Sequence, residues 1–255
     1  MSTENSAIDT LLHPDWIVPV VPRGVVLEKH SLAISGGQIS QILPRAQARD
    51  LKASKEIELP GQALMPGLVN LHGHAAMSLL RGFADDLPLM PWLEQHIWPA
   101  EGKYVSEAFV RDGTELAIAE MLRAGTTTFS DMYFFPDACA ATANRLGMRC
   151  QITFPILDLP TAWARDADEY ISKGLALRDD VKHQELITVG FGPHAPYTVS
   201  PANLAKVATL AAELDIPVQI HLHVTSGEVL RAVEEHGARP LDSLNELGLL
   251  GPRTQ

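Results

Sequence analysis

Two histidines close the segment Met65-Pro-Gly-Leu-Val-Asn-Leu-His72-Gly-His74, directly after a short apolar run. The segment Pro217-Val-Gln-Ile-His221-Leu-His223 repeats this arrangement much later in the chain. Apolar runs without polar alternation fit strands that are buried on both faces of a parallel sheet. Residues i and i+2 of a strand share a face, so each histidine pair is expected to point into one cavity.

Apolar runs alternate with helical patterns from Leu64 onward. Strand–helix–strand alternation predicts parallel strands with helices outside them. Five such units at this spacing are typical of a (β/α)₈ barrel, whereas a doubly wound sheet would carry a Gly-rich phosphate loop after its first strand, and none is present. The predicted fold is therefore α/β, an incomplete (β/α)₈ TIM-like barrel over residues 61–255. The expected strands are Leu64–Leu71, Thr127–Met132, Cys150–Leu157, Ile187–Phe191 and Pro217–Leu222, and the clearest expected helices are Ser106–Ala124 and Pro201–Leu214.

Residues 1–60 form a separate region that reads as short strands. The run Ser31–Ser35, the pair Gly36-Gly37 and the run Gln38–Ile42 predict a β-hairpin with a two-residue turn. One or two hairpins cannot bury enough apolar area alone. We therefore expect residues 1–60 to be a small β-unit that packs beside the barrel-like domain.

Composition excludes several classes of partner. The 255 residues include 20 Lys and Arg against 31 Asp and Glu, a formal net charge of −11, which argues against binding nucleic acid or an anionic membrane surface. No apolar stretch approaches the roughly 20 residues that span a bilayer. Two cysteines and an N-terminus without secretory features favour the cytoplasm. The sequence leaves a homo-oligomer open.

The histidines are the candidate functional residues. Both pairs, and His194 after the fourth expected strand, follow the carboxyl ends of strands, where barrel enzymes build their active sites. A catalytic zinc needs about three protein ligands and an open water position. The alternative is a set of structural polar residues at the barrel mouth. The other histidines are expected on the surface or in loops: His13, His30, His96, His183 and His236.

The segment from Met65 to His74, with Ala75-Ala-Met-Ser-Leu-Leu-Arg81-Gly82, resembles the amidohydrolase superfamily. Within it the sequence is similar to 5-methylthioadenosine/S-adenosylhomocysteine deaminases and the triazine-hydrolase-like group. The resemblance covers essentially the whole chain and implies that residues 1–60 are the N-terminal part of a small β-sandwich. Its supporting segments are Asp85-Asp-Leu-Pro-Leu-Met-Pro-Trp92-Leu, Ile97-Trp-Pro-Ala-Glu101, Ala124-Gly-Thr-Thr-Thr, Asp131-Met-Tyr and Gly192-Pro-His194-Ala-Pro-Tyr.

The resemblance also implies the roles of single residues. Its metal ligands correspond to His72, His74 and His221, which suit Zn²⁺ and also Fe²⁺. Glu101 and His194 match positions that contact a purine nucleoside substrate, and Trp92 matches an apolar wall. The alternative roles are a solvated carboxylate for Glu101 and core packing for Trp92; His223 is assigned only a structural hydrogen bond.

The implied chemistry is hydrolytic deamination, in which a metal activates water and a carboxylic acid moves the proton to the ring. The sequence departs from this pattern in two ways. Val224 stands where the family has the proton-shuttling glutamate, and Glu228, four residues later, is not expected to replace it. The chain also stops before the later barrel strands, so we expect a truncated chain with impaired activity.

Three functions remain open at this point. The first is a deaminase of methylthioadenosine or S-adenosylhomocysteine. The second is another amidohydrolase that acts on guanine, cytosine or a triazine. The third is a non-catalytic remnant that binds a metal or a partner chain, which Val224 favours.

Overall fold

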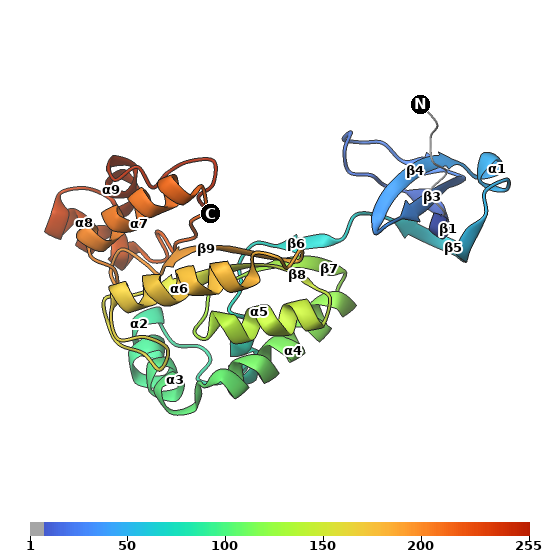
Figure 1. Ribbon diagram of the computed structural model, residues 1–255. Coiled ribbons are helices and arrows are strands. Elements are labelled where there is room, and N and C mark those ends of the chain that lie inside the picture. Colours follow the sequence, from blue (N-terminus) through green and yellow to red (C-terminus); the bar gives the residue numbers. More distant parts are fainter. Residues whose placement is uncertain (1–7) are drawn as a thin grey trace. The chain divides into compact units, whose positions relative to one another are not determined.

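The computed structural model describes residues 8–255 (Figure 1). The chain divides into two compact units, the first ending at Gly67 and the second spanning Leu68–Gln255. No helix in the described part is long and apolar enough to cross a membrane.

The first unit contains one five-stranded sheet in its described residues. The strand order is β2-β1-β3-β4, and β5 pairs with the other edge of β1 in parallel. The predicted hairpin is present as β3 and β4, and Gly36 and Gly37 have φ of 58° and 75°, as a two-residue primed turn requires. The elements are β1 (Ile8–Ile17), β2 (Leu27–Glu28), β3 (His30–Ser35), β4 (Gln38–Pro44), helix α1 (Arg45–Ala48) and β5 (Ala53–Leu64).

The first unit has a small apolar core of its own, formed by Ile8, Leu11, Ala33 and Ala48. Strand β5 continues through residue 60 to Leu64, so this unit extends beyond the boundary expected from the sequence.

One expectation about a histidine of this unit is wrong. His13 is buried rather than exposed, because it lies on β1 with its Nδ1 2.7 Å from Ser31 Oγ on β3.

The second unit is built on a parallel four-stranded sheet in the order β6-β7-β8-β9, with α4 against β7, α5 against β8 and α6 against β8 and β9 (Figure 1). The strands are β6 (Leu68–Asn70), β7 (Thr126–Asp131), β8 (Arg149–Ile156) and β9 (Ile187–Pro193). The helices are the 3₁₀ helix η1 (Ala75–Leu80), α2 (Leu89–Trp92), the π-helix η2 (Leu93–Ile97), α3 (Trp98–Tyr104), α4 (Glu107–Arg123), α5 (Pro136–Arg145), α6 (Ala167–Val181), α7 (Pro201–Leu214), α8 (Ser226–His236) and α9 (Pro240–Glu246).

The two helices expected most clearly from the sequence are confirmed. Helix α7 has the predicted bounds, with Pro201 at its first position, where a missing N–H costs nothing. Helix α4 begins after Ser106, whose hydroxyl accepts a hydrogen bond from the Phe109 N–H at 3.3 Å.

The core of the second unit lies between the sheet and its helices. The apolar runs of β7, β8 and β9 supply it, and each contributes a phenylalanine that is at most 1% exposed: Phe129, Phe154 and Phe191. Phe154 and Phe191 make an edge-to-face contact with ring centroids 5.0 Å apart. The carboxyl-terminal halves of these strands are buried on both faces, including the polar side chains of Ser130 and Thr153.

The prediction of a full fifth strand at Pro217–Leu222 is wrong. This segment pairs with β9 only through an isolated parallel bridge between Phe191 and Val218. Continued pairing would require N–H donors at Pro193 and at Pro217, and proline has none. The segment nevertheless stays beside β9, because Gln219 N donates to Phe191 O and His221 N donates to His194 O, both at 2.9 Å.

Candidate metal centre and adjoining cavity

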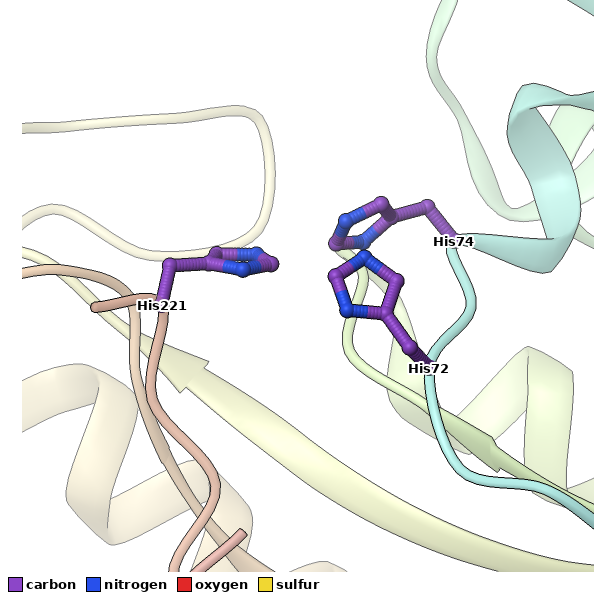
Figure 2. Close-up of side chains that lie close together, drawn as sticks. All are labelled: His72, His74 and His221. Carbon is purple, nitrogen blue, oxygen red and sulfur yellow. The ribbon is translucent and has the colours of Figure 1, made fainter. Parts of the chain in front are cut away.

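Three imidazoles converge at the carboxyl ends of the parallel strands. His72 and His74 lie between β6 and η1, and His221 lies in the extended segment between α7 and α8, which runs beside β9. Their candidate ligand atoms all lie within 4.8 Å of one another, and Figure 2 shows the three rings pointing toward a common centre. The ring centroid of His221 is 5.1 Å from those of both His72 and His74. This convergence agrees with the placement of the histidines in the sequence.

The segment that carries His72 and His74 is fixed to the end of β7. Gly73 O accepts a hydrogen bond from Met132 N at 3.1 Å, and the buried Asp131 carboxylate accepts one from Ala75 N at 2.5 Å. A Cβ on Gly73 would lie 3.1 Å from Ser130 O, so glycine permits this close approach. Burial raises the pKa of Asp131 to about 6. These contacts orient the two neighbouring histidines.

The protonation of the cluster suits metal binding. His74 Nδ1 lies 2.6 Å from Met132 O, and because a carbonyl only accepts, Nδ1 carries the proton and Nε2 keeps its lone pair in the neutral ring. Burial lowers the pKa of His74. Burial and the neighbouring His74, His194 and His72 lower the pKa of His221 to about 3. Neutral imidazole is the form that binds metals.

His194 lies beside the three-histidine cluster without belonging to it. Its ring centroid is 5.2 Å from that of His221. Its Nδ1 lies 2.8 Å from Thr198 Oγ1, whose own proton is donated to Ala195 O at 3.1 Å. His194 Nδ1 therefore donates, and Nε2 keeps its lone pair. Burial, followed by the neighbouring His74, lowers the pKa of His194 to about 4.

A cavity of about 450 Å³ adjoins the cluster. The structure brings all six candidate residues from the sequence to its wall, including Trp92, Glu101 and His194. This volume is within the range of small-molecule sites, which are mostly apolar with a few placed polar groups. The other lining side chains are predominantly apolar and include Met77, Leu89, Leu93, Ile97, Trp98, Val105, Phe134, Leu157, Leu159 and Val224.

Glu101 is the acidic side chain of this wall, and it is held by a tyrosine. Tyr133 OH donates to Glu101 Oε1 at 2.7 Å. Burial raises the pKa of Glu101, and the hydrogen bond from Tyr133 opposes that change. Burial and the Glu101 charge raise the pKa of Tyr133, so the phenol keeps its proton and remains the donor.

Val224 contributes an isopropyl group to the same wall. The carboxylate of Glu228 accepts hydrogen bonds from Val224 N at 2.7 Å and His223 N at 3.1 Å, while Thr225 Oγ1 accepts one from Glu228 N at 3.2 Å. This reciprocal arrangement caps the start of α8. Glu228 therefore serves the helix terminus, in agreement with the expectation that it does not replace a shuttle at position 224.

The expectation that His221 and His223 share a cavity is wrong. His223 has a left-handed backbone with φ of 56°, which breaks the two-residue alternation of an extended chain. Its ring turns away from the cluster, and its Nε2 accepts a weak hydrogen bond from Leu241 N at 3.3 Å. The structural role assigned to His223 from the sequence fits this contact.

Sequence reasoning missed two polar residues of this region. Tyr133 lies within the segment Asp131-Met-Tyr, where no role was assigned to it. Gln219 is buried two residues before His221. The two-residue spacing from His221 was an available signal for Gln219, whereas nothing local in the sequence links Tyr133 to Glu101.

Comparisons with known proteins agree on one family. The amidohydrolase family matches residues 63–255. The chain is 54% identical over 254 residues to a protein of Saccharophagus degradans named 5-methylthioadenosine/S-adenosylhomocysteine deaminase, covering 99% of this chain and 57% of that relative. The chain thus spans somewhat more than half the length of the curated relatives it matches.

Solved structures show the same fold. A structure described as an adenosine deaminase from Xanthomonas campestris with bound zinc matches with a TM-score of 0.95 and 48% identity, covering 98% of this chain and 57% of that one. An atrazine chlorohydrolase from Arthrobacter aurescens matches with a TM-score of 0.86 at 19% identity, covering 96% and 59%, and shows the fold alone. The family match, the α/β fold and the histidine pattern agree: the chain belongs to the amidohydrolase family.

Proposed function

We propose that this chain is a metal-dependent hydrolytic deaminase of purine nucleosides, of the 5-methylthioadenosine or S-adenosylhomocysteine type, whose chemistry is impaired at Val224. The observation that carries the proposal is the convergence of three imidazoles at the wall of a cavity that also presents a carboxylate. The name of the 54% identical relative supports the substrate class.

We propose zinc as the metal and His72, His74 and His221 as its ligands. Three imidazoles leave an open position, as catalytic zinc sites do, although the same donors also suit Fe²⁺. The bond from His74 Nδ1 to Met132 O is the outer-shell contact that usually fixes a metal-binding histidine. A bound zinc would supply Lewis-acid activation of water. The zinc in the 48% identical structure supports this choice.

We propose that Glu101, His194 and Trp92 bind the nucleoside. The Glu101 carboxylate offers acceptors for ribose hydroxyl groups, and Tyr133 keeps one of its oxygens in place. His194 Nε2 has a free lone pair next to His221, where it can accept a proton or a hydrogen bond from the substrate. Trp92 supplies a flat apolar surface for a purine or a thioether.

A second candidate function is binding of metal and nucleoside without catalysis. Val224 is the observation that favours it, because an isopropyl group cannot transfer a proton. Activity on guanine, cytosine or a triazine has less support. The solved structures of triazine hydrolases and of a guanine deaminase are at most 21% identical to this chain and share only its fold.

We also propose how the two units relate to complete members of the family. The second unit corresponds to the first five strand–helix units of a barrel, with Pro217–Leu222 in the place of the fifth strand. The first unit corresponds to the N-terminal part of a small β-sandwich. This chain covers 57% of the length of the zinc-bound deaminase structure, and this partial coverage supports the assignment.

Nucleoside binding tests the proposal. We expect the zinc-loaded chain to bind methylthioadenosine and S-adenosylhomocysteine in isothermal titration calorimetry, and to bind guanine and atrazine at least about 10-fold more weakly. Glu101→Gln should weaken methylthioadenosine binding by about 10- to 100-fold, because a hydrogen bond to a charged group contributes roughly 1.5–3 kcal/mol.

Glu107→Gln is the matched control, since Glu107 is exposed in the first turn of α4 and does not line the cavity. Unchanged affinity in Glu107→Gln and weakened affinity in Glu101→Gln would support the proposed site. Equal affinity of the zinc-loaded chain for all four compounds, or no effect of Glu101→Gln, would contradict it.

A further inference from the structure

Gln219 is a buried polar side chain that connects distant parts of the second unit. It is 8% exposed and lies in the extended segment that carries His221. Its Oε1 accepts hydrogen bonds from Thr153 Oγ1 at 2.7 Å and Ser130 Oγ at 3.0 Å. Its Nε2 donates to Leu71 O at 2.9 Å. One side chain therefore contacts β7, β8 and the end of β6.

The bond to Leu71 joins the two halves of the three-histidine cluster. Leu71 directly precedes His72, and Gln219 lies two residues before His221 on the same extended segment. The two bonded residues are 148 positions apart in the sequence. The geometry of the cluster thus depends on a contact that neither β6 nor the His221 segment can make within itself.

Regular strand pairing is short beside both halves, although backbone hydrogen bonds hold each half to its own neighbours. Strand β6 has only three residues and pairs with β7 in an irregular register. Leu71 itself is 58% exposed, so its side chain gives little packing. The His221 segment meets β9 in a single bridge because Pro193 and Pro217 lack donors. The bond from Gln219 to Leu71 O adds a direct connection between these two segments to the backbone bonds that hold each of them to its neighbours.

The chemistry of the contact requires an amide. Leu71 O is a carbonyl and only accepts, so Gln219 Nε2 faces it and Oε1 faces the hydroxyl groups of Ser130 and Thr153, which are at most 2% exposed; the Thr153 hydroxyl is shared between Gln219 Oε1 and Asp131 O. Leu71 O must receive a donor from the same side chain. Glutamate could satisfy the hydroxyl groups and would lose the donor, while an apolar residue would satisfy none of the three partners.

We propose that Gln219 is a positioning residue that sets the distance between His72 and His221 and thereby tunes the affinity of the cluster for a divalent metal. This inference rests on the proposed metal site. Outer-shell partners of metal-binding side chains typically change metal affinity by about 10- to 100-fold when they are replaced. Gln219 acts one step further away, through the backbone of each ligand-bearing segment.

Zinc affinity of the 255-residue chain tests the proposal, measured by competition with a chromophoric chelator at pH 7.5. We expect Gln219→Met, which keeps the length of the side chain, to weaken zinc binding by about 10- to 100-fold. Gln151→Met is the matched control. Gln151 lies on β8, donates to Gln255 Oε1 at 3.0 Å and lies 3.5 Å from Ser130 Oγ, so it shares one partner with Gln219 and makes no described hydrogen bond to Leu71 or to the His221 segment. Its zinc affinity should remain within about 2-fold of the original chain.

Gln219→Glu isolates the bond to Leu71, since it keeps the acceptors for Ser130 and Thr153. It should also weaken zinc binding by about 10-fold, and this variant decides the question if Gln219→Met does not fold by circular dichroism. The d–d absorption of bound Co²⁺ should change in both Gln219 variants and stay constant in Gln151→Met.

Unchanged zinc affinity in a folded Gln219 variant would overturn this inference and leave the proposed metal site intact. An equal loss in Gln151→Met would overturn it as well, because the effect would then reflect general destabilisation of the sheet. Failure of the original chain to bind zinc would overturn both the inference and the proposed function.

Discussion

His221→Ala is expected to weaken zinc binding by more than about 100-fold and to leave the purified chain without stoichiometric metal. His221 is the ligand candidate that comes from the other side of the cavity, so its removal leaves only the two imidazoles of one loop. Two ligands cannot enclose a zinc ion that normally takes three or four from the protein. Metal content after dialysis, together with chelator competition, measures the effect.

His223→Ala is the matched control for this experiment. It removes an imidazole of the same kind two residues further along the chain. This ring is exposed and faces Leu241 instead of the cluster. We expect it to keep one zinc per chain with nearly unchanged affinity. One zinc per chain in His221→Ala, or a loss of the same size in His223→Ala, would show that the three-histidine cluster does not hold the metal.

The zinc-loaded chain is expected to bind methylthioadenosine and to release ammonia at least about 100-fold more slowly than the Saccharophagus degradans relative. Val224 places an isopropyl group on the cavity wall where the resemblance to deaminases requires a proton-transferring carboxylate. Loss of general acid–base assistance typically lowers a rate by about 100- to 10,000-fold. Ammonia release in a coupled assay measures the rate, and the Saccharophagus degradans relative provides the assay control.

Among residues 8–255, neither carboxylate near this wall is placed to take over this step. Glu228 caps the start of α8 through the N–H groups of His223 and Val224, and Glu101 is held by Tyr133. Zinc-dependent ammonia release within about 10-fold of the rate of that relative would contradict the expectation, and it would mean that the proton reaches the ring by another route.

Local patterns in the sequence predicted most of the second unit. The period of the apolar residues and the capping residues predicted α4 and α7, and short apolar-rich runs predicted β7, β8 and β9. These signals depend only on near neighbours. The same applies to the hairpin of the first unit, whose Gly36-Gly37 turn has a strong local preference.

The errors arise where pairing or backbone conformation depends on the rest of the fold. An apolar run at Pro217–Leu222 looked like the earlier strands, but Pro193 on the neighbouring strand removes a donor that the run itself cannot reveal. His223 was grouped with His221 by spacing, whereas its left-handed backbone turns it away.

The candidate site shows the same division. The histidines of the cluster could be found because each follows a strand end, and strand ends meet at one edge of a parallel sheet. The spacing from His221 could have singled out Gln219 as a candidate, but the partners of Gln219 and Tyr133 could not be predicted, because Leu71 and Glu101 lie 148 and 32 positions away. Such contacts become visible only when the chain is folded.

The central claim is that His72, His74 and His221 hold one metal ion at the wall of the nucleoside-sized cavity. Anomalous X-ray diffraction at the zinc absorption edge, from crystals of the zinc-loaded chain, tests it most directly. We expect one strong anomalous peak about 2.0–2.1 Å from a nitrogen of each of the three imidazoles. A fully occupied zinc peak bound elsewhere, with no peak among these three side chains, would contradict the claim.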